Sequence, residues 1–409
     1  MQKRFRGPAR RASSHNKKSF HSHNRGGGRR RPPSANVPIK HYINKGVPVI
    51  APEAASIEHG FADFAFHPSL AKNLVAKGYE TPTPIQDKTI KPLIDGRDVV
   101  GLANTGTGKT AAFVLPIIHQ QLQQKTRNGA LIITPTRELA HQVSDEFRSF
   151  ARGTGLFSVV CVGGENIYRQ KQELRRGVNV VIGTPGRLKD LLKQGELKLD
   201  NTKTLVLDEA DQMLDMGFLP DMRFIMQALP SAKQTVCFSA TMTPAIQQLL
   251  SGIQDNALTI STQAKVTSEH IDQNVIPANT TEEKMQAIQQ LLDHQSYDKI
   301  LIFGETKRGV QRIADNLMKQ GYRAQAIHGN KTQSQRQRAL KAFKQSDNAI
   351  LVATDVAARG LDIPNVHLVV NYDQPQTHDT YIHRIGRTGR AGQSGVARTF
   401  VLRSDFATL

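Results

Sequence analysis

The sequence contains no tryptophan, only two cysteines and few aromatic residues, which make up 6% of its 409 residues. No apolar run approaches the roughly 18–20 residues that a membrane-spanning helix requires, so we expect a soluble protein with no membrane partner. We expect it in the cytoplasm, with the nucleus or an organelle as alternatives in a eukaryote. Cys161 and Cys237 lie in separate apolar runs, which favours buried core positions over a disulfide or a metal site. An apolar fraction of 38% is sufficient for aliphatic cores, and the length indicates more than one domain.

Acidic residues are absent from residues 1–40, which hold 12 of the 54 basic residues. The rest of the chain has 42 basic and 35 acidic side chains, so most of the net charge of +19 belongs to this segment. Its Arg, Gly, Ser and Pro content predicts disorder, and we assign residues 1–52 to a disordered basic tail. A polyanion is the expected partner. A purely solubilising tail and an organellar targeting peptide are the alternatives.

Short apolar runs alternate with helix-length segments from Phe61 onward. Strands are predicted in the first half at 98–103, 130–134, 178–183, 204–208 and 235–239, and in the second half at 299–303, 324–328, 349–354, 367–371 and 396–401. Such alternation favours parallel sheets with helices on both faces. We therefore expect an α/β fold of two tandem parallel-sheet domains, at 53–262 and 270–409, joined by a linker at 263–269. One very wide sheet is the alternative.

A glycine-rich turn follows the first predicted strand and precedes a helix. Gly106 and Gly108 allow backbone N–H groups to surround phosphates, Lys109 would reach the β- and γ-phosphates, and the Thr110 hydroxyl would bind Mg²⁺. The residues expected around the nucleotide are Ala103, Asn104, Thr105, Gly106, Thr107, Gly108, Lys109 and Thr110. Ala103 stands where this pattern usually has glycine.

Carboxylates end a second apolar strand, in the run Thr204-Leu-Val-Leu-Asp-Glu-Ala-Asp211. Asp208 would hold Mg²⁺ through water, and Glu209 would polarise the attacking water as general base. A phosphate loop together with these acids predicts a nucleoside triphosphatase that uses Mg²⁺; the resemblance described next implies that the nucleotide is ATP.

These two motifs, with others in the same order, resemble those of the DEAD-box RNA helicases of helicase superfamily two, from Phe61 to about Leu402. The resemblance implies two RecA-like domains and ATP-dependent unwinding of RNA. The run Gly78-Tyr-Glu-Thr-Pro-Thr-Pro-Ile-Gln86 looks like the family's Q motif. By that resemblance Gln86 reads the adenine edge, and Tyr79 or Phe61 packs on the base.

The resemblance also assigns roles to loops in both halves of the chain. RNA contacts are implied for Thr136, Arg137, Gly164, Thr184, Arg187, Arg336 and Thr354, with helix capping as the alternative for Thr136. Asp211, Ser239 and Thr241 would couple the ATP site to the RNA face. Gly360 and Asp362 would approach the ribose. Arg387 and Arg390 would act as catalytic arginine fingers on the γ-phosphate.

Several departures and alternatives stay open. Gln212 and Gly304 replace residues more frequent in the family, and the family's next helix is cut short at Leu409, which implies a truncated second domain. Expected partners are single-stranded RNA and short duplexes, bound without sequence preference by a monomer, with accessory ribonucleoprotein partners. A DNA helicase of the same superfamily and an ATP-gated RNA clamp or annealing chaperone are the rival functions.

Overall fold

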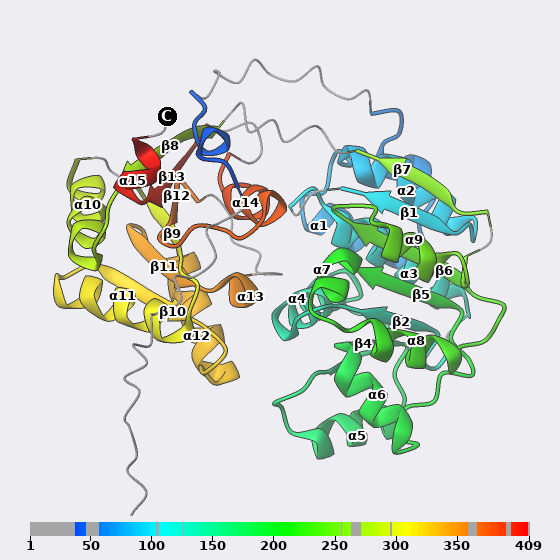
Figure 1. Cartoon of the computed structure of the whole chain (residues 1–409). Helices are drawn as coiled ribbons and strands as arrows, with labels where there is room; N and C mark the ends of the chain where they lie inside the picture. The colour runs from blue at the N-terminus through cyan, green and yellow to red at the C-terminus, as the bar shows by residue number, and fades with distance from the viewer. Residues whose placement is uncertain are drawn as a thin grey trace, which may run out of the picture. The chain divides into compact units, whose positions relative to one another are not determined.

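A computed structural model of the chain describes residues 37–45, 57–103, 106–124, 126–254, 256–262, 271–294, 297–358, 366–389 and 394–407. These residues form two parallel sheets of seven and six strands, in the order β3-β4-β2-β5-β6-β1-β7 and β10-β11-β9-β12-β13-β8 (Figure 1). The predicted α/β fold with two parallel-sheet domains is confirmed.

The first sheet lies within residues 57–262. Its strands are β1 (Val99–Leu102), β2 (Ala130–Ile133), β3 (Ser158–Cys161), β4 (Val180–Gly183), β5 (Thr204–Asp208), β6 (Gln234–Ser239) and β7 (Leu258–Ser261). Its helices are η2 (Phe61–Phe64), α1 (Pro68–Ala76), α2 (Pro84–Ile94), α3 (Lys109–Gln124), α4 (Arg137–Phe150), α5 (Ile167–Arg176), α6 (Pro185–Lys193), α7 (Ala210–Asp215), α8 (Leu219–Gln227) and α9 (Pro244–Leu250).

Successive strand residues of this sheet enter two separate cores. Val206 packs in the core beneath α1 to α4, whereas its neighbours Leu205 and Leu207 pack in the core beneath α5 to α9. Because side chains alternate across a strand, a strand that is buried on both faces must be apolar at nearly every position. Cys161 and Cys237 are buried in the second of these cores, as predicted, and burial raises the pKa of the Cys161 thiol to about 12.

The second sheet contains β8 (Ile271–Pro277), β9 (Lys299–Phe303), β10 (Arg323–Ile327), β11 (Ala349–Ala353), β12 (Leu368–Asn371) and β13 (Gly395–Val401). Its helices are α10 (Thr281–His294), α11 (Lys307–Lys319), α12 (Gln333–Gln345), α13 (Asp355–Ala358), α14 (His378–Ile385) and α15 (Arg403–Phe406). Again Ile300 and Ile302 point into one core, while Leu301 and Phe303 point into the other.

Residues 37–45 fold with the second sheet although they precede the first in sequence. The short 3₁₀ helix η1 (Ile39–Tyr42) is followed by Asn44, which forms an antiparallel bridge with Gln273 of β8. Val37 and Tyr42 join a buried cluster with residues of β8, β13 and α14. The disorder expected over residues 1–52 therefore does not extend through 37–45.

Candidate nucleotide and RNA site

The functional loops expected in the first domain follow the carboxyl ends of six neighbouring strands of its sheet. Since all paired strands of the first sheet are parallel, these ends lie along one edge of it. The strand order places the loops expected to bind RNA after β3, β4 and β2, and those expected to bind ATP after β5, β6 and β1. The two groups of loops are thus adjacent and meet between β2 and β5.

The phosphate loop connects β1 to α3. Gly106 and Gly108 have φ values of 85° and 91°, a region that favours glycine. Lys109 is buried and its Nζ donates a 2.8 Å hydrogen bond to the Ala103 carbonyl. Lys109 is thereby held inside the turn.

Gln86 connects the Q motif to this loop. Its Nε2 donates to the Gly108 carbonyl at 3.1 Å, and its Oε1 accepts from the Thr83 N–H at 2.9 Å. A β-carbon on Gly108 would lie 2.5 Å from Gln86 Nε2, so only glycine permits this approach. The Gln86 amide is thus hydrogen-bonded directly to the phosphate loop.

Phe61 and Tyr79, the two aromatics expected beside the base, lie next to each other. Their ring centroids are 5.7 Å apart, and Tyr79 also packs edge-on against Phe150. The Tyr79 hydroxyl lies 3.1 Å from Glu146 Oε1, and burial together with this carboxylate raises its pKa to about 12. Tyr79 therefore keeps its proton and is held by contacts at both ends of the side chain.

Asp208 is the buried carboxylate at the end of β5. It is 2% exposed, and among the described residues its Oδ1 has no hydrogen-bond partner. Burial raises the pKa of Asp208 to about 7, while the Lys109 ammonium acts in the opposite direction. A buried carboxylate oxygen without a partner beside a phosphate loop fits a hard cation.

The described residues contain no group of three or more His, Cys, Asp or Glu that could form a closed metal site. Mg²⁺ does not need one, because it is usually held by one or two protein oxygens, water and phosphate. Glu209, the next residue, has φ +53°, in the left-handed region, and begins α7. Such backbone strain in a residue other than glycine is typical of functional positions.

Asp211 joins the ends of β5 and β6. Its Oδ2 accepts from the backbone N–H groups of Ala240 and Thr241 at 3.0 and 3.1 Å, and the Thr241 hydroxyl lies at 3.4 Å. Ser239 Oγ accepts from the Asp211 N–H at 3.3 Å. The hydrogen bonds expected among these three residues are present and connect the two loops.

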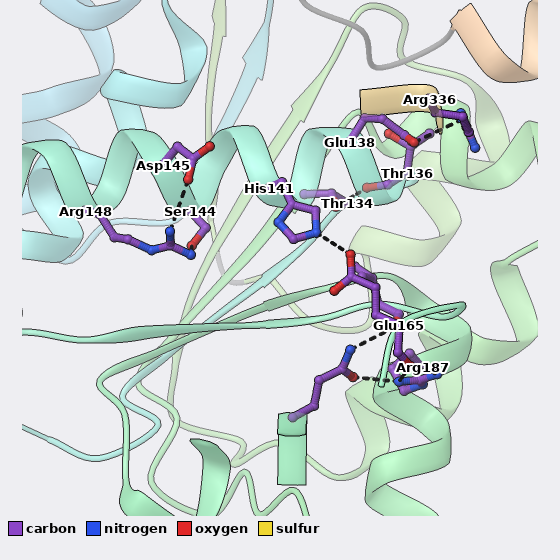
Figure 2. Close-up of polar contacts among 12 residues, drawn as sticks. Thr134, Thr136, Glu138, His141, Ser144, Asp145, Arg148, Glu165, Arg187 and Arg336 are labelled. Atoms are coloured by element: carbon purple, nitrogen blue, oxygen red, sulfur yellow. Dashed lines mark hydrogen bonds and ion pairs between the residues drawn. The ribbon is translucent and has the colours of Figure 1, made fainter. Parts of the chain in front are cut away.

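Arg137 and Gly164 lie together at the edge expected to bind RNA. Gly164 has φ +76°, and a β-carbon there would lie 2.0 Å from Arg137 Nη1. The guanidinium thus covers the glycine. Nearby, Arg187 Nη1 donates to Gln170 Oε1 at 2.7 Å, and His141 Nε2 lies 2.7 Å from Glu165 Oε1 (Figure 2). The hydrogen bond to Gln170 thus fixes Arg187, one of the two arginines expected to contact phosphate.

Thr136 and Thr184 both stand at helix N-termini. The Thr136 hydroxyl accepts from the Leu139 N–H at 3.3 Å, so the helix-capping alternative for this residue is present. Thr184 occupies the cap position of α6 without a side-chain cap bond and is 9% exposed. Its hydroxyl, unlike that of Thr136, is not used in capping.

In the second domain, Thr354 and Arg336 lie near the end of β11. Thr354 follows that strand, and Arg336 Nη2 lies 3.5 Å from the Ala357 carbonyl. Arg384 of α14 forms a bidentate ion pair with Asp355 at 2.6 and 2.7 Å and also donates to the Asp373 carbonyl. Arg387 follows this helix and is 5% exposed.

Five of the expected site residues lie outside the described residues. These are Asn104, Thr105, Gly360, Asp362 and Arg390.

Both halves of the chain match known helicase families. A family profile for DEAD/DEAH box helicases matches residues 83–249, and one for the helicase conserved C-terminal domain matches residues 283–392. An ATP-dependent RNA helicase CshA of Limosilactobacillus reuteri is 45% identical over 346 residues, which are 84% of this chain and 69% of that protein. The chain belongs to the DEAD-box family of ATP-dependent RNA helicases.

Further relatives of this helicase agree in sequence and structure. CshA of Bacillus subtilis is 42% identical over 83% of this chain and 69% of its own length. The structure of S. cerevisiae Dbp5 bound to RNA and ADP BeF3 matches with a TM-score of 0.74 and 31% identity, over 85% of this chain and 90% of that one. Mss116p bound to ssRNA and AMP-PNP matches with a TM-score of 0.77 and 31% identity, over 88% and 78%. The helicase thus has the RecA-like fold and the ATP-dependent RNA helicase activity expected from its motifs.

Within the part of the helicase that the structure describes, no helix has both the length and the apolar character needed to cross a membrane.

Sequence reasoning missed two side-chain pairs of the helicase. One is Arg384 with Asp355; the signal was an arginine three residues before Arg387, and an acid directly after a predicted strand. The other is His59 with Asp87, whose Nδ1 and Oδ1 are 2.8 Å apart. Asp87 also accepts from the backbone N–H groups of Glu58 and His59, so it fixes the chain just before Phe61.

Proposed function

We propose that this helicase binds the RNA backbone through the loops after β3, β4 and β2 while ATP occupies the loops after β5, β6 and β1. The observation that supports this most directly is the strand order, which separates the two sets of loops and leaves the Asp211 hydrogen bonds close to their junction. The relatives bound to RNA and a nucleotide analogue support the same pairing of ligands.

In this proposal Lys109 neutralises the β- and γ-phosphates, and Asp208 with Thr110 holds Mg²⁺. When bound, the ion would neutralise charge on the phosphate oxygens. Glu209 polarises the water that attacks the γ-phosphorus and accepts its proton, while the β–γ bridging oxygen leaves with ADP. Gln86 supplies one amide donor and one acceptor, which suit adenine and not guanine.

Arg387 and Arg390 would stabilise charge on the transferring phosphoryl group from the second domain. Closure of the two domains then depends on both ATP and RNA. Each ligand shifts the equilibrium between the open and closed states only as far as it binds the closed state more tightly. A pinched RNA backbone strains a neighbouring duplex, and hydrolysis releases it. Backbone contacts carry no base identity, so we expect unwinding of short duplexes without sequence preference.

The first test is the nucleotide turnover of Glu209→Gln with and without RNA. The substitution keeps shape and removes the base, so we expect turnover to fall by about 10²–10⁴ with ATP binding retained. Unchanged turnover would refute the assignment of Glu209. Equal hydrolysis of GTP and ATP by the unmodified protein would refute that of Gln86.

The polynucleotide can be tested separately. Stimulation by single-stranded RNA and not by DNA of the same sequence is the expected result, and equal stimulation would favour the DNA-helicase alternative. Removing residues 1–36 leaves the folded segment 37–45 intact and should weaken RNA affinity and its salt dependence while ATP turnover persists. Loss of all turnover on this deletion would favour a clamp in which the tail is dominant.

A further inference from the structure

Residues 37–45 attach to the edge of the second sheet through backbone pairing. The Asn44 N–H donates to the Gln273 carbonyl at 2.9 Å, and the Gln273 N–H donates to the Asn44 carbonyl at 2.7 Å. Gln273 belongs to β8, the last strand in the order of that sheet. The segment thus covers a strand whose outer side would otherwise present unpaired backbone groups.

Tyr42 is the main side-chain contact of this segment. It is 0% exposed, whereas the next residue, Ile43, is 42% exposed. The Tyr42 ring lies 4.7 Å from the Tyr381 ring in an edge-on arrangement. Its hydroxyl is buried and has no hydrogen-bond partner among the described residues. The ring, and not the hydroxyl, therefore supplies the contact.

Tyr381 belongs to α14, the helix that precedes Arg387. Tyr381 and Ile385 are packed in the cluster with Tyr42, and the Tyr381 hydroxyl donates to Gln273 Oε1 at 2.8 Å. One turn further along the same helix, Arg384 is bound to Asp355. Gln273 thus contacts both the N-terminal segment and α14.

The helix α14 has only eight residues, so its position depends on packing more than on its own stability. From these contacts we infer that residues 37–45 brace α14, and that Tyr42 is a positioning residue for ATP hydrolysis. The inference rests on the proposed role of Arg387. Tyr42 acts through Tyr381: its ring limits the tilt of α14 and hence the placement of the guanidinium that follows the helix.

The test compares steady-state ATP turnover of Tyr42→Ala and Tyr42→Phe with the matched control Ile43→Ala in the full chain with saturating RNA. A misplacement of about 1 Å can cost on the order of a hundredfold in rate. We expect Tyr42→Ala to lower kcat by about ten- to a hundredfold. KM for ATP should stay unchanged, because Gln86 and Lys109, which are proposed to bind the base and the phosphates before reaction, lie in the first domain, whereas Arg387 is proposed to act on the transferring phosphoryl group.

The two comparison variants separate positioning from simple disruption. Tyr42→Phe keeps the ring and removes a hydroxyl without a hydrogen bond, so it should retain wild-type kcat. Ile43→Ala removes an exposed side chain of the same segment and should also retain it. If Tyr42→Ala does not fold, Tyr42→Leu fills more of the cavity and should give a smaller loss of kcat at unchanged KM.

Arg387→Ala distinguishes failure of this inference from failure of the proposed site. If Arg387→Ala lowers kcat and folded Tyr42→Ala or Tyr42→Leu turns over at the wild-type rate, the brace is refuted and the arginine role stands. If Arg387→Ala itself leaves turnover unchanged, the proposed site is refuted, and the brace with it. Removal of residues 1–45, compared with removal of 1–36, should reproduce the loss seen for Tyr42→Ala; equal kcat for the two deletions would overturn the inference.

Discussion

Substitution of Gly164 tests the RNA site through one steric contact. In Gly164→Ala the new β-carbon would lie 2.0 Å from Arg137 Nη1, whereas ordinary contact begins at 3.4 Å. The guanidinium must therefore retreat by about 1.4 Å, which is enough to break a hydrogen bond to phosphate. A hydrogen bond to a charged group contributes about 1.5–3 kcal/mol, so we expect RNA affinity to fall about tenfold or more.

Gly153→Ala is the matched control for this substitution. Gly153 also has positive φ, +74°, but nothing lies within 4 Å of its β-carbon position. Both variants incur the left-handed backbone cost of about 1–2 kcal/mol, so both should lose similar stability. Only Gly164→Ala should weaken RNA binding.

The assay is fluorescence anisotropy of a labelled single-stranded RNA with a non-hydrolysable ATP analogue, at several salt concentrations, with thermal unfolding in parallel. Loss of one phosphate contact should also reduce the slope of log affinity against log salt by about 1. Equal RNA affinity for the two variants would refute the proposed role of Arg137 and Gly164.

Three other outcomes follow from the contacts described. Burial raises the pKa of Asp208 to about 7, and Mg²⁺ binds only the ionised carboxylate. The apparent Mg²⁺ affinity of the ATP complex should therefore fall by up to about tenfold per pH unit below 7. Magnesium titrations at several pH values check this, and an affinity that does not change with pH contradicts it. Asp211→Asn weakens the hydrogen bonds from the Ala240 and Thr241 N–H groups, so duplex unwinding should drop more than ATP turnover. Strand displacement and phosphate release are measured on the same samples. Equal losses in the two assays would count against a role of Asp211 in coupling hydrolysis to unwinding. Arg384→Lys keeps the charge but cannot keep the bidentate pair with Asp355, so it should destabilise the second domain by about 1.5–3 kcal/mol in denaturant unfolding. An unchanged midpoint would show that the second hydrogen bond contributes little.

The sequence predicted the bounds of some buried strands closely and missed others. The strands β5 and β9 have the predicted bounds, because fully buried parallel strands are short continuous apolar runs. The strand β3 was not predicted, since four apolar residues do not distinguish a strand from other buried segments. The edge strand β8 was not predicted because Asp272, Gln273 and Asn274 interrupt its apolar pattern.

The site was predictable where chemistry depends on local spacing and less so where it depends on distant partners. Lys109, Asp208 and Gln86 stand in compact motifs, and the structure brings the motifs together as strand order requires. The ion pair of Arg384 with Asp355 joins separate segments, so no single run of residues indicates it. The contact of Tyr42 with Tyr381 spans most of the chain and has no local pattern at all.

The docking of residues 37–45 also makes the second domain discontinuous in sequence. The second domain contains residues 37–45 and the residues from 271 onward, and the whole first domain lies between these two segments in the sequence, as an inserted domain does. A single cut between 263 and 270 would leave the two pieces held by the Tyr42 cluster and the Asn44 bridge. A fragment that starts at 271 would instead expose the apolar side of Tyr381 and Ile385 to water, so isolating the second domain intact requires 37–45 to be supplied with it.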